Sequence, residues 1–157
     1  MSRIRANPLI QLVDEVARLQ GRIGGLFEAV HAESGLRPME DLVLNAIVEA
    51  DTPPTVPQIG RSLGHPRQVI QRAVNTLLTD GFLERLPNPD HKRAPLFTLT
   101  AKGERLKEHT DRMALEIADA FLDGDDPERC RRLVGELREL RKSLEAFARE
   151  THPGDEQ

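Results

Sequence analysis

The sequence predicts a mainly α-helical fold with one small β-hairpin. Three observations support this prediction. Apolar residues recur at three- and four-residue spacing near both ends of the chain, as in long amphipathic helices. The middle of the chain holds two helical segments that are joined by a short turn with glycine. Two partly alternating segments follow, 82–86 and 96–100, and these are typical of strands joined by a loop.

Length and composition fit one globular domain over residues 1–150. The chain of 157 residues is long enough to bury a core, and its five Phe without Trp or Tyr favour an aliphatic one. The single cysteine, Cys130, excludes an intrachain disulfide and suits a reducing compartment. No apolar run approaches the ~18 residues of a membrane span. We therefore expect a cytoplasmic protein that does not enter a membrane.

The charge of the chain is unevenly distributed. The formal net charge is −4. Residues 55–100 hold six Lys or Arg against three Asp or Glu, so this segment has a net charge of +3 and the rest −7. A basic segment on an acidic chain indicates that one face meets phosphate while the remainder repels it.

The first predicted helix spans residues 8–35. Asn7 is suited to the N-cap and Pro8 to the first helical position, and Ser34-Gly35 should end the helix. Its apolar residues form a narrow heptad seam, which is typical of a helix that packs against a partner helix. The seam consists of Leu9, Leu12, Val16, Leu19, Ile23, Leu26 and Val30.

Two helices are predicted next, over residues 38–50 and Val56–Leu63. The second begins with a capping box in which Thr55 is the cap and Gln58 follows three residues later. A turn with glycine over residues 63–66 then leads into a third helix, which ends at Asp80-Gly81. A helix, a short turn and a second helix form a helix-turn-helix.

The third helix has two chemically different sides. Its apolar side faces the expected core. The other side spans about 140° on a helical wheel and carries guanidinium and amide groups without a carboxylate. The residues of this polar side are Arg67, Gln68, Gln71, Arg72 and Asn75. Such groups match the edges of guanine and adenine in a major groove, although a solvated helix face is the ordinary alternative.

The loop between the two predicted strands has prolines at its rim and a basic tip, Lys92 and Arg93. A basic hairpin directly after a helix-turn-helix is a wing. Residues 38–100 therefore predict a winged helix-turn-helix, and the order of the parts is a stronger signal for DNA binding than either part alone.

A long helix should follow from Thr100 as its cap to about Leu122, and a last helix should start at Asp126-Pro127. The last helix carries a second apolar seam. It consists of Cys130, Leu133, Leu137, Leu140, Leu144 and Phe147. We expect the helices within 8–35 and 101–150 to mediate dimerisation, although the two seams could instead pack on each other within one chain. Residues 151–157 are expected to form a disordered tail.

Other chemistry is weakly supported. Cys130 has arginine neighbours that could favour its thiolate, but its position in the seam favours inert packing over oxidant sensing. The five histidines lack the spacing of a zinc motif, so we expect no metal and no cofactor. No nucleophile with a base, phosphate loop or acid pair suggests an enzyme.

Several segments resemble the MarR family of bacterial transcription regulators. The matching segments are Ile59–Gly64, Arg67–Arg72, Asp80–Leu83, Asn88–Arg93 and Leu99–Gly103. The resemblance implies a homodimer, interleaved through its terminal helices, that binds a near-palindromic operator. It also implies that recognition helices enter successive major grooves, that Arg93 enters the minor groove, and that Asp90 braces Arg93 through an ion pair.

The chain departs from the family at the start of the recognition helix. Ser or Thr is common there, whereas this chain has Pro66, so His65 is the expected cap and one phosphate contact is in doubt. The resemblance further implies an effector pocket between the dimerisation helices and the reading module. Its expected lining is Phe27, His31, His109 and Met113.

We interpret the sequence as that of a sequence-specific, ligand-responsive repressor whose partners are double-stranded DNA, a second copy and a small molecule. Two alternatives are an architectural DNA binder without effector control and a winged-helix module that binds protein. A protein-binding helix should show exposed apolar anchors in place of Arg67, Gln71 and Arg72.

Overall fold

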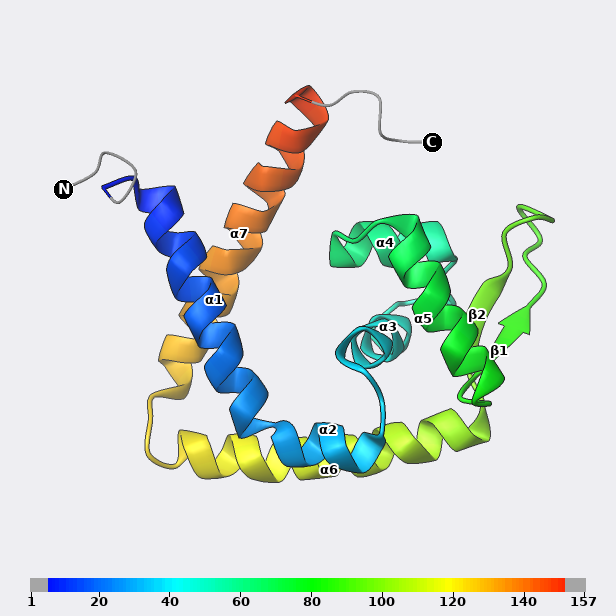
Figure 1. Ribbon diagram of the computed structural model, residues 1–157, viewed down its shortest axis with the longest axis horizontal. Helices are drawn as coiled ribbons and strands as arrows, with labels where there is room; N and C mark the ends of the chain where they lie inside the picture. The colour runs from blue at the N-terminus through cyan, green and yellow to red at the C-terminus, as the bar shows by residue number, and fades with distance from the viewer. Residues whose placement is uncertain (1–5, 152–157) are drawn as a thin grey trace. The chain divides into compact units, whose positions relative to one another are not determined.

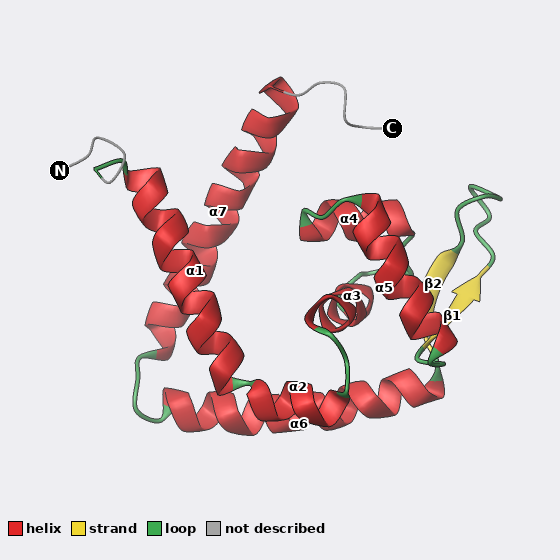
Figure 2. Ribbon diagram, viewed as in Figure 1, coloured by secondary structure: helices red, strands yellow, loops and turns green. Residues whose placement is uncertain are grey.

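A computed structural model describes residues 6–151. Within these residues the chain forms seven α-helices and one antiparallel two-stranded sheet, in the order traced in Figure 1 and coloured by type in Figure 2. The mainly α fold with a small hairpin is therefore confirmed. The chain divides into two compact units, one ending at Ile117 and one starting at Ala118. None of the described helices is both long enough and apolar enough to cross a membrane.

The first predicted helix is two helices, α1 (Pro8–Leu26) and α2 (Glu28–Ser34). Asn7 caps α1, since its Oδ1 accepts hydrogen bonds from the next two free N–H groups at 2.9 and 3.3 Å. Phe27 interrupts the helix at φ −99° and ψ 14°, although its N–H still reaches the oxygen of Ile23 at 3.0 Å. Two glycines of low helix propensity precede it, and they permit this bend.

The core lies between α3 (Pro38–Val48), α4 (Val56–Leu63), α5 (Arg67–Thr79) and the hairpin. Its buried members are aliphatic apart from one phenylalanine, as the composition predicted. They are Leu36, Val43, Leu44, Ile47, Val56, Ile59, Ile70, Ala73, Val74, Leu77, Leu83 and Phe97. Burial of this apolar surface fixes the rotation of α5, so that its polar side is left in solvent.

The turn between α4 and α5 is well determined by its sequence. The capping box of α4 is confirmed, because Gln58 Oε1 accepts the N–H of Thr55 at 2.7 Å. Gly64 ends α4 in the left-handed conformation with φ 67°. The expected cap of α5 is wrong, since Pro66 and not His65 holds that position, and a proline ring accepts no hydrogen bond.

The hairpin pairs β1 (Leu83–Leu86) with β2 (Leu96–Leu99), with Leu83 opposite Leu99. Phe97 is buried, and its N–H donates to the oxygen of Pro54 at 3.0 Å. This bond ties β2 to the loop before α4. The wing is therefore held against the helix-turn-helix at its base, while its loop extends away.

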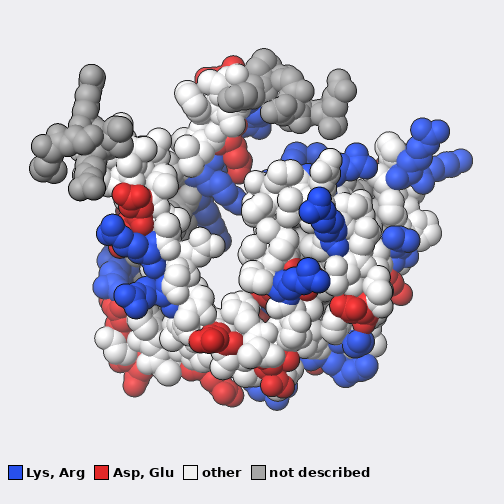
Figure 3. Space-filling view, in the orientation of Figure 1, with Lys and Arg blue, Asp and Glu red and all other residues white. Residues whose placement is uncertain are grey.

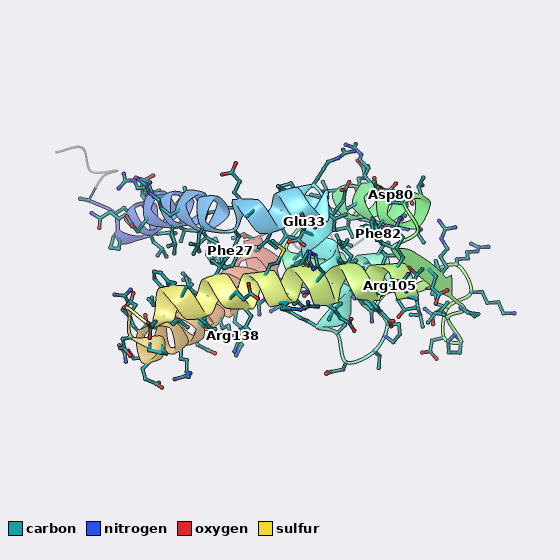
Figure 4. All side chains as sticks on the ribbon, turned by 90° about the horizontal axis from the view of Figure 1, so that it is seen from below. Phe27, Glu33, Asp80, Phe82, Arg105 and Arg138 are labelled. Carbon is teal, nitrogen blue, oxygen red and sulfur yellow. The ribbon has the colours of Figure 1, made fainter. Side chains whose placement is uncertain are left out.

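The start of α6 (Ala101–Leu122) is attached to the hairpin and to the end of α5. Thr100 caps α6 as predicted, since its Oγ1 accepts the N–H of Gly103 at 3.2 Å while donating to the oxygen of Gly81 at 2.6 Å. A Cβ on Gly103 would lie 2.2 Å from the oxygen of Phe82, so only glycine permits this close approach. Figure 4 labels Asp80 and Phe82 near the same end of α6.

The last helix, α7, spans Pro127–Thr151. Asp126 Oδ1 accepts the N–H of Glu128 at 3.0 Å, which confirms the predicted cap. No residue of α7 is buried, and Cys130 is partly exposed. Thr151 belongs to this helix and not to a tail, and the rest of the expected tail, 152–157, lies outside the described residues.

Candidate nucleic-acid interface

The solvent side of α5 carries the residues predicted to read DNA. Arg67, Gln68, Arg72 and Asn75 are exposed, and Gln71 is partly buried. Figure 3 shows Lys and Arg atoms gathered over the winged-helix part and at the tip of the hairpin. The side is free of large exposed apolar groups and of carboxylates, so it offers donors and acceptors for an anionic, polar partner.

Gln71 and Asn75 act as a pair. Gln71 Nε2 donates to Asn75 Oδ1 at 3.0 Å. The second N–H and the oxygen of Gln71 remain available, as does the amide nitrogen of Asn75, so the pair can donate and accept at a base edge. Thr76 and Thr79 instead bond back to carbonyl oxygens of α5 at 3.2 and 2.9 Å, which leaves reading to the amides.

The loop of the wing is closed by Asn88. Its Nδ2 donates to the oxygen of Ala94 at 2.8 Å, and its Oδ1 accepts the N–H of Asp90 at 3.0 Å. The N–H of Arg93 reaches His91 Nδ1 at 3.3 Å. These bonds order the loop while the side chains of Lys92 and Arg93 stay exposed. Sequence reasoning missed Asn88, whose amide is a common loop-closing group.

The expected ion pair between Asp90 and Arg93 is not among the ion pairs of residues 6–151. The backbone N–H of Asp90 bonds to Asn88 and that of Arg93 to His91. Bracing of Arg93 by Asp90 in a DNA complex stays a prediction.

A cavity of about 240 Å³ lies between α1, α2, α3 and α6, within the unit that ends at Ile117. Phe27 and His31 line it as expected, together with Lys107, which forms an ion pair with Asp111. Its other lining residues are Ile23, Val30, Asp41, Asn45, Thr110 and Ala114.

His109 and Met113 do not line this cavity. His109 Nε2 lies 3.3 Å from Glu33 Oε1, across the outside of α2 and α6. Figure 4 labels Phe27 and Glu33 along the same side of α6. Of the two histidines expected in the lining, His31 lines this cavity and His109 does not. Across residues 6–151, no group of three or more His, Cys, Asp or Glu is placed to hold a metal ion.

A second cavity is lined by residues of the candidate interface. It measures about 230 Å³, between α4, α5 and the hairpin, and Arg67, Gln71 and Arg93 line it together with Arg85 of β1. Sequence reasoning counted Arg85 as a cation but gave it no role. The sequence did hold a signal for Arg85. It follows Leu83 by two residues, so the two side chains share the face of the strand that is expected to cover the core.

Comparison with known proteins gives a consistent result. A sequence profile of the MarR family matches residues 34–94. An uncharacterised protein of Mycobacterium tuberculosis is 31% identical over 141 residues, which cover 90% of this chain and 97% of that protein. The chain belongs to the MarR family. The HTH-type transcriptional regulator BilQ of Clostridium symbiosum is 37% identical over 75 residues, or 48% of this chain and 52% of BilQ.

The fold agrees with that of MarR proteins. A mutant MarR of Escherichia coli, solved in complex with operator DNA, has a TM-score of 0.69 at 18% identity, and the match covers 85% of this chain and 96% of that one. With the family established and α5 and the wing in place, this protein is a DNA-binding transcriptional regulator of the MarR family.

Proposed function

We propose that this MarR-family protein is a homodimeric, ligand-responsive repressor that binds a near-palindromic operator. The observation that carries the proposal is the surface shared by α5 and the wing, where exposed guanidinium and amide groups gather and the polar side of α5 holds no carboxylate. In this proposal α5 enters a major groove and the wing an adjacent minor groove. Arg67 and Gln71 read bases, Arg72 and Lys92 bind phosphate, and Gln68 and Asn75 complete the contact.

Exposed apolar side chains support the homodimer. No residue of α1 is buried, and Leu19 and Ile23 are 50% and 47% exposed. On α7, Leu133 and Leu144 are 48% and 47% exposed. Within its own unit each helix leaves these apolar side chains exposed, and a second copy with the same seams would cover them. A two-fold axis would then present two α5 helices to two half-sites.

The dimer can be tested on α1. Leu19→Glu with Ile23→Glu should give a monomer or an aggregate in sedimentation experiments, because charge is placed in the seam. Arg18→Glu is a matched control, since Arg18 is exposed and pairs only with Glu15 at 3.7 Å. A double variant that remains a dimer of unchanged affinity would exclude α1 from the interface.

Repression and ligand response rest on separate observations. A dimer bound to two successive major grooves covers the DNA between them. When its operator lies within a promoter, the bound dimer therefore excludes other proteins from that promoter. The cavity that holds Phe27 and His31 combines four apolar residues with six polar or charged ones, so a ligand with both apolar and polar groups would fit it. A ligand there would contact α1, α2, α3 and α6, and could change the separation of the two α5 helices in the dimer.

The decisive experiment is selection of bound sequences from random DNA, repeated with candidate phenolic or oxidant ligands. The proposal expects one enriched motif with two-fold symmetry, and weaker enrichment when an effector is present. An enriched motif that never responds to ligands would favour an architectural binder. No enrichment would favour the protein-binding alternative, although α5 shows no exposed apolar anchor for a protein.

A further inference from the structure

Three arginines from separate segments surround the cavity of about 230 Å³ between α4, α5 and the hairpin. Arg67 comes from the first turn of α5, Arg85 from β1 and Arg93 from the loop of the wing. Gln71 adds an amide. The remaining lining is Val56, Pro57, Ala94, Pro95 and Phe97. No acidic residue lines the cavity, so it is a positively charged hollow with an apolar floor.

The three guanidinium groups have no partner in the part of the chain that the structure describes. Among residues 6–151, no ion pair or side-chain hydrogen bond involves the guanidinium of Arg67, Arg85 or Arg93. Like charges around one hollow repel one another, and this repulsion disfavours the folded state. An anion in the hollow would relieve it and would accept charge-assisted hydrogen bonds.

Arg85 is placed where packing would favour an apolar residue. It stands opposite Phe97 in the register of the hairpin, and cross-strand partners project from the same face of a sheet. Leu83, two residues earlier on this face, is buried. Glu84 lies on the other face. Arg85 thus shares the face of the strand that begins in the core, but its side chain is exposed at the hollow.

The proposed DNA complex requires a sugar–phosphate strand at this place. A major groove that holds α5 and an adjacent minor groove that holds the wing are separated by one strand of the duplex. That strand must cross the gap between α5 and the hairpin, where the hollow lies. A guanidinium can bind a phosphate through two parallel N–H groups, which fixes position as well as supplying charge.

We infer that Arg85 binds one phosphodiester group of this strand in the hollow, with Arg67 and Arg93 on either side of it. The inference rests on the proposed function and adds a phosphate-binding residue to it. Arg85 reads no base. It sets the position of α5 relative to the wing on the duplex, because the phosphate it holds lies between the two grooves.

The first test compares Arg85→Gln with wild type in the full chain. Fluorescence anisotropy over a range of KCl concentrations measures Kd for the selected operator and for an unrelated duplex. We expect Arg85→Gln to lower the slope of log Kd against log salt by ~1 and to weaken both duplexes about 10-fold. Base preference should not change, and Arg85→Lys should recover most of the slope.

Arg105→Gln is the matched control, because Arg105 is exposed on α6, outside the hollow, and its loss changes the net charge equally. Its slope should equal that of wild type, and an equal fall in both variants would overturn the inference. A wild-type chain that binds no DNA would disprove the proposed function itself. Wild-type binding with an unchanged slope for Arg85→Gln would overturn only the phosphate contact.

The second test locates the phosphate. Operators are made with one uncharged methylphosphonate in each half-site, moved along the strand one position at a time. Wild type should lose affinity at one symmetric position that does not affect Arg85→Gln, and both proteins should respond alike elsewhere. The same sensitivity in both proteins at every position would overturn the inference. The inference would also be overturned if inorganic phosphate bound in the hollow but no methylphosphonate position in the operator lowered the affinity of wild type.

Discussion

The cations of the winged helix-turn-helix and those of α7 are placed differently. In α7, Arg129, Arg131, Arg132, Arg141 and Lys142 all form ion pairs with nearby carboxylates. In the winged helix-turn-helix, no ion pair among the described residues includes a cation between residues 55 and 100. These five cations of α7 are neutralised by carboxylates of α7 or of the turn before it, whereas Arg138 and Arg149 of α7 have no ion pair among the described residues. The cations of residues 55–100 all lack such a partner.

The difference shows that net charge is a poor guide to DNA binding in this protein. The chain is acidic overall, at −4, yet none of the Lys and Arg side chains of residues 55–100 has an ion pair among the described residues. Paired arginines present a neutral surface to an approaching phosphate, while unpaired ones attract it at long range. Function therefore depends on which cations lack partners and on how rigidly the fold holds them.

The largest expected effect concerns the core that holds α5 and the hairpin in place. Phe97 is 2% exposed and lines both the core and the hollow. Phe97→Ala should lower the free energy of unfolding by about 3–5 kcal/mol, because it leaves a cavity. Denaturant titration at a fixed chain concentration measures it. Leu42→Ala is the control at 43% exposure, and we expect a loss of about 0.5 kcal/mol. If Phe97→Ala and Leu42→Ala lowered the free energy of unfolding by similar amounts, Phe97 would not anchor the hairpin.

Much of the fold around this core could be predicted from the sequence, because local signals determine it. The box of Thr55 and Gln58, the cap at Thr100 and the glycine at position 64 each act over a few residues. The bend at Phe27 could not be predicted with the same certainty, since the two glycines before it only weaken a helix.

The candidate site was predictable on α5 and less so elsewhere. The period of α5 determines which residues share a side, so Arg67 and Gln71 follow from sequence alone. Arg85 needed the register of the hairpin and the depth of the core, which are properties of packing. His109 and Met113 do not line the cavity that holds Phe27 and His31, and which residues of α6 face α2 depends on tertiary contacts that the sequence does not show.

The second prediction separates cations that read bases from those that hold phosphate. Arg67→Ala or Gln71→Ala should relax preference at one symmetric pair of operator positions, by about 1–3 kcal/mol. Arg72, about 140° round the helix from Arg67, should bind phosphate, so Arg72→Ala should weaken specific and unrelated DNA equally. Competition against single-base operator variants measures both. A change in base preference from Arg72→Ala alone would show that α5 is rotated in the groove.

The third prediction concerns the tip of the wing. Arg93→Ala should weaken operator binding about 10-fold and lower the salt slope by ~1, because a cation in the minor groove is lost. Asn88→Ala should have a smaller effect, since it loosens the loop but keeps the charge. Affinity measured against salt concentration distinguishes them. An unchanged slope for Arg93→Ala would mean that the wing does not touch the duplex.

The smallest expected effect comes from the paired cations of α7. Arg131 forms an ion pair with Glu128, and their side chains are 68% and 65% exposed. Exposed pairs contribute about 0–1 kcal/mol, because water screens the charges and pairing restricts two long side chains. Arg131→Ala, Glu128→Ala and the double variant should therefore give a coupling energy below about 0.5 kcal/mol in thermal unfolding. Because Glu128 already neutralises Arg131, Arg131→Ala should also leave Kd for the operator and its salt slope at the wild-type values. A loss of affinity with a lower slope would show that α7 reaches phosphate, and the contrast between paired and unpaired cations would then no longer mark the DNA-binding surface.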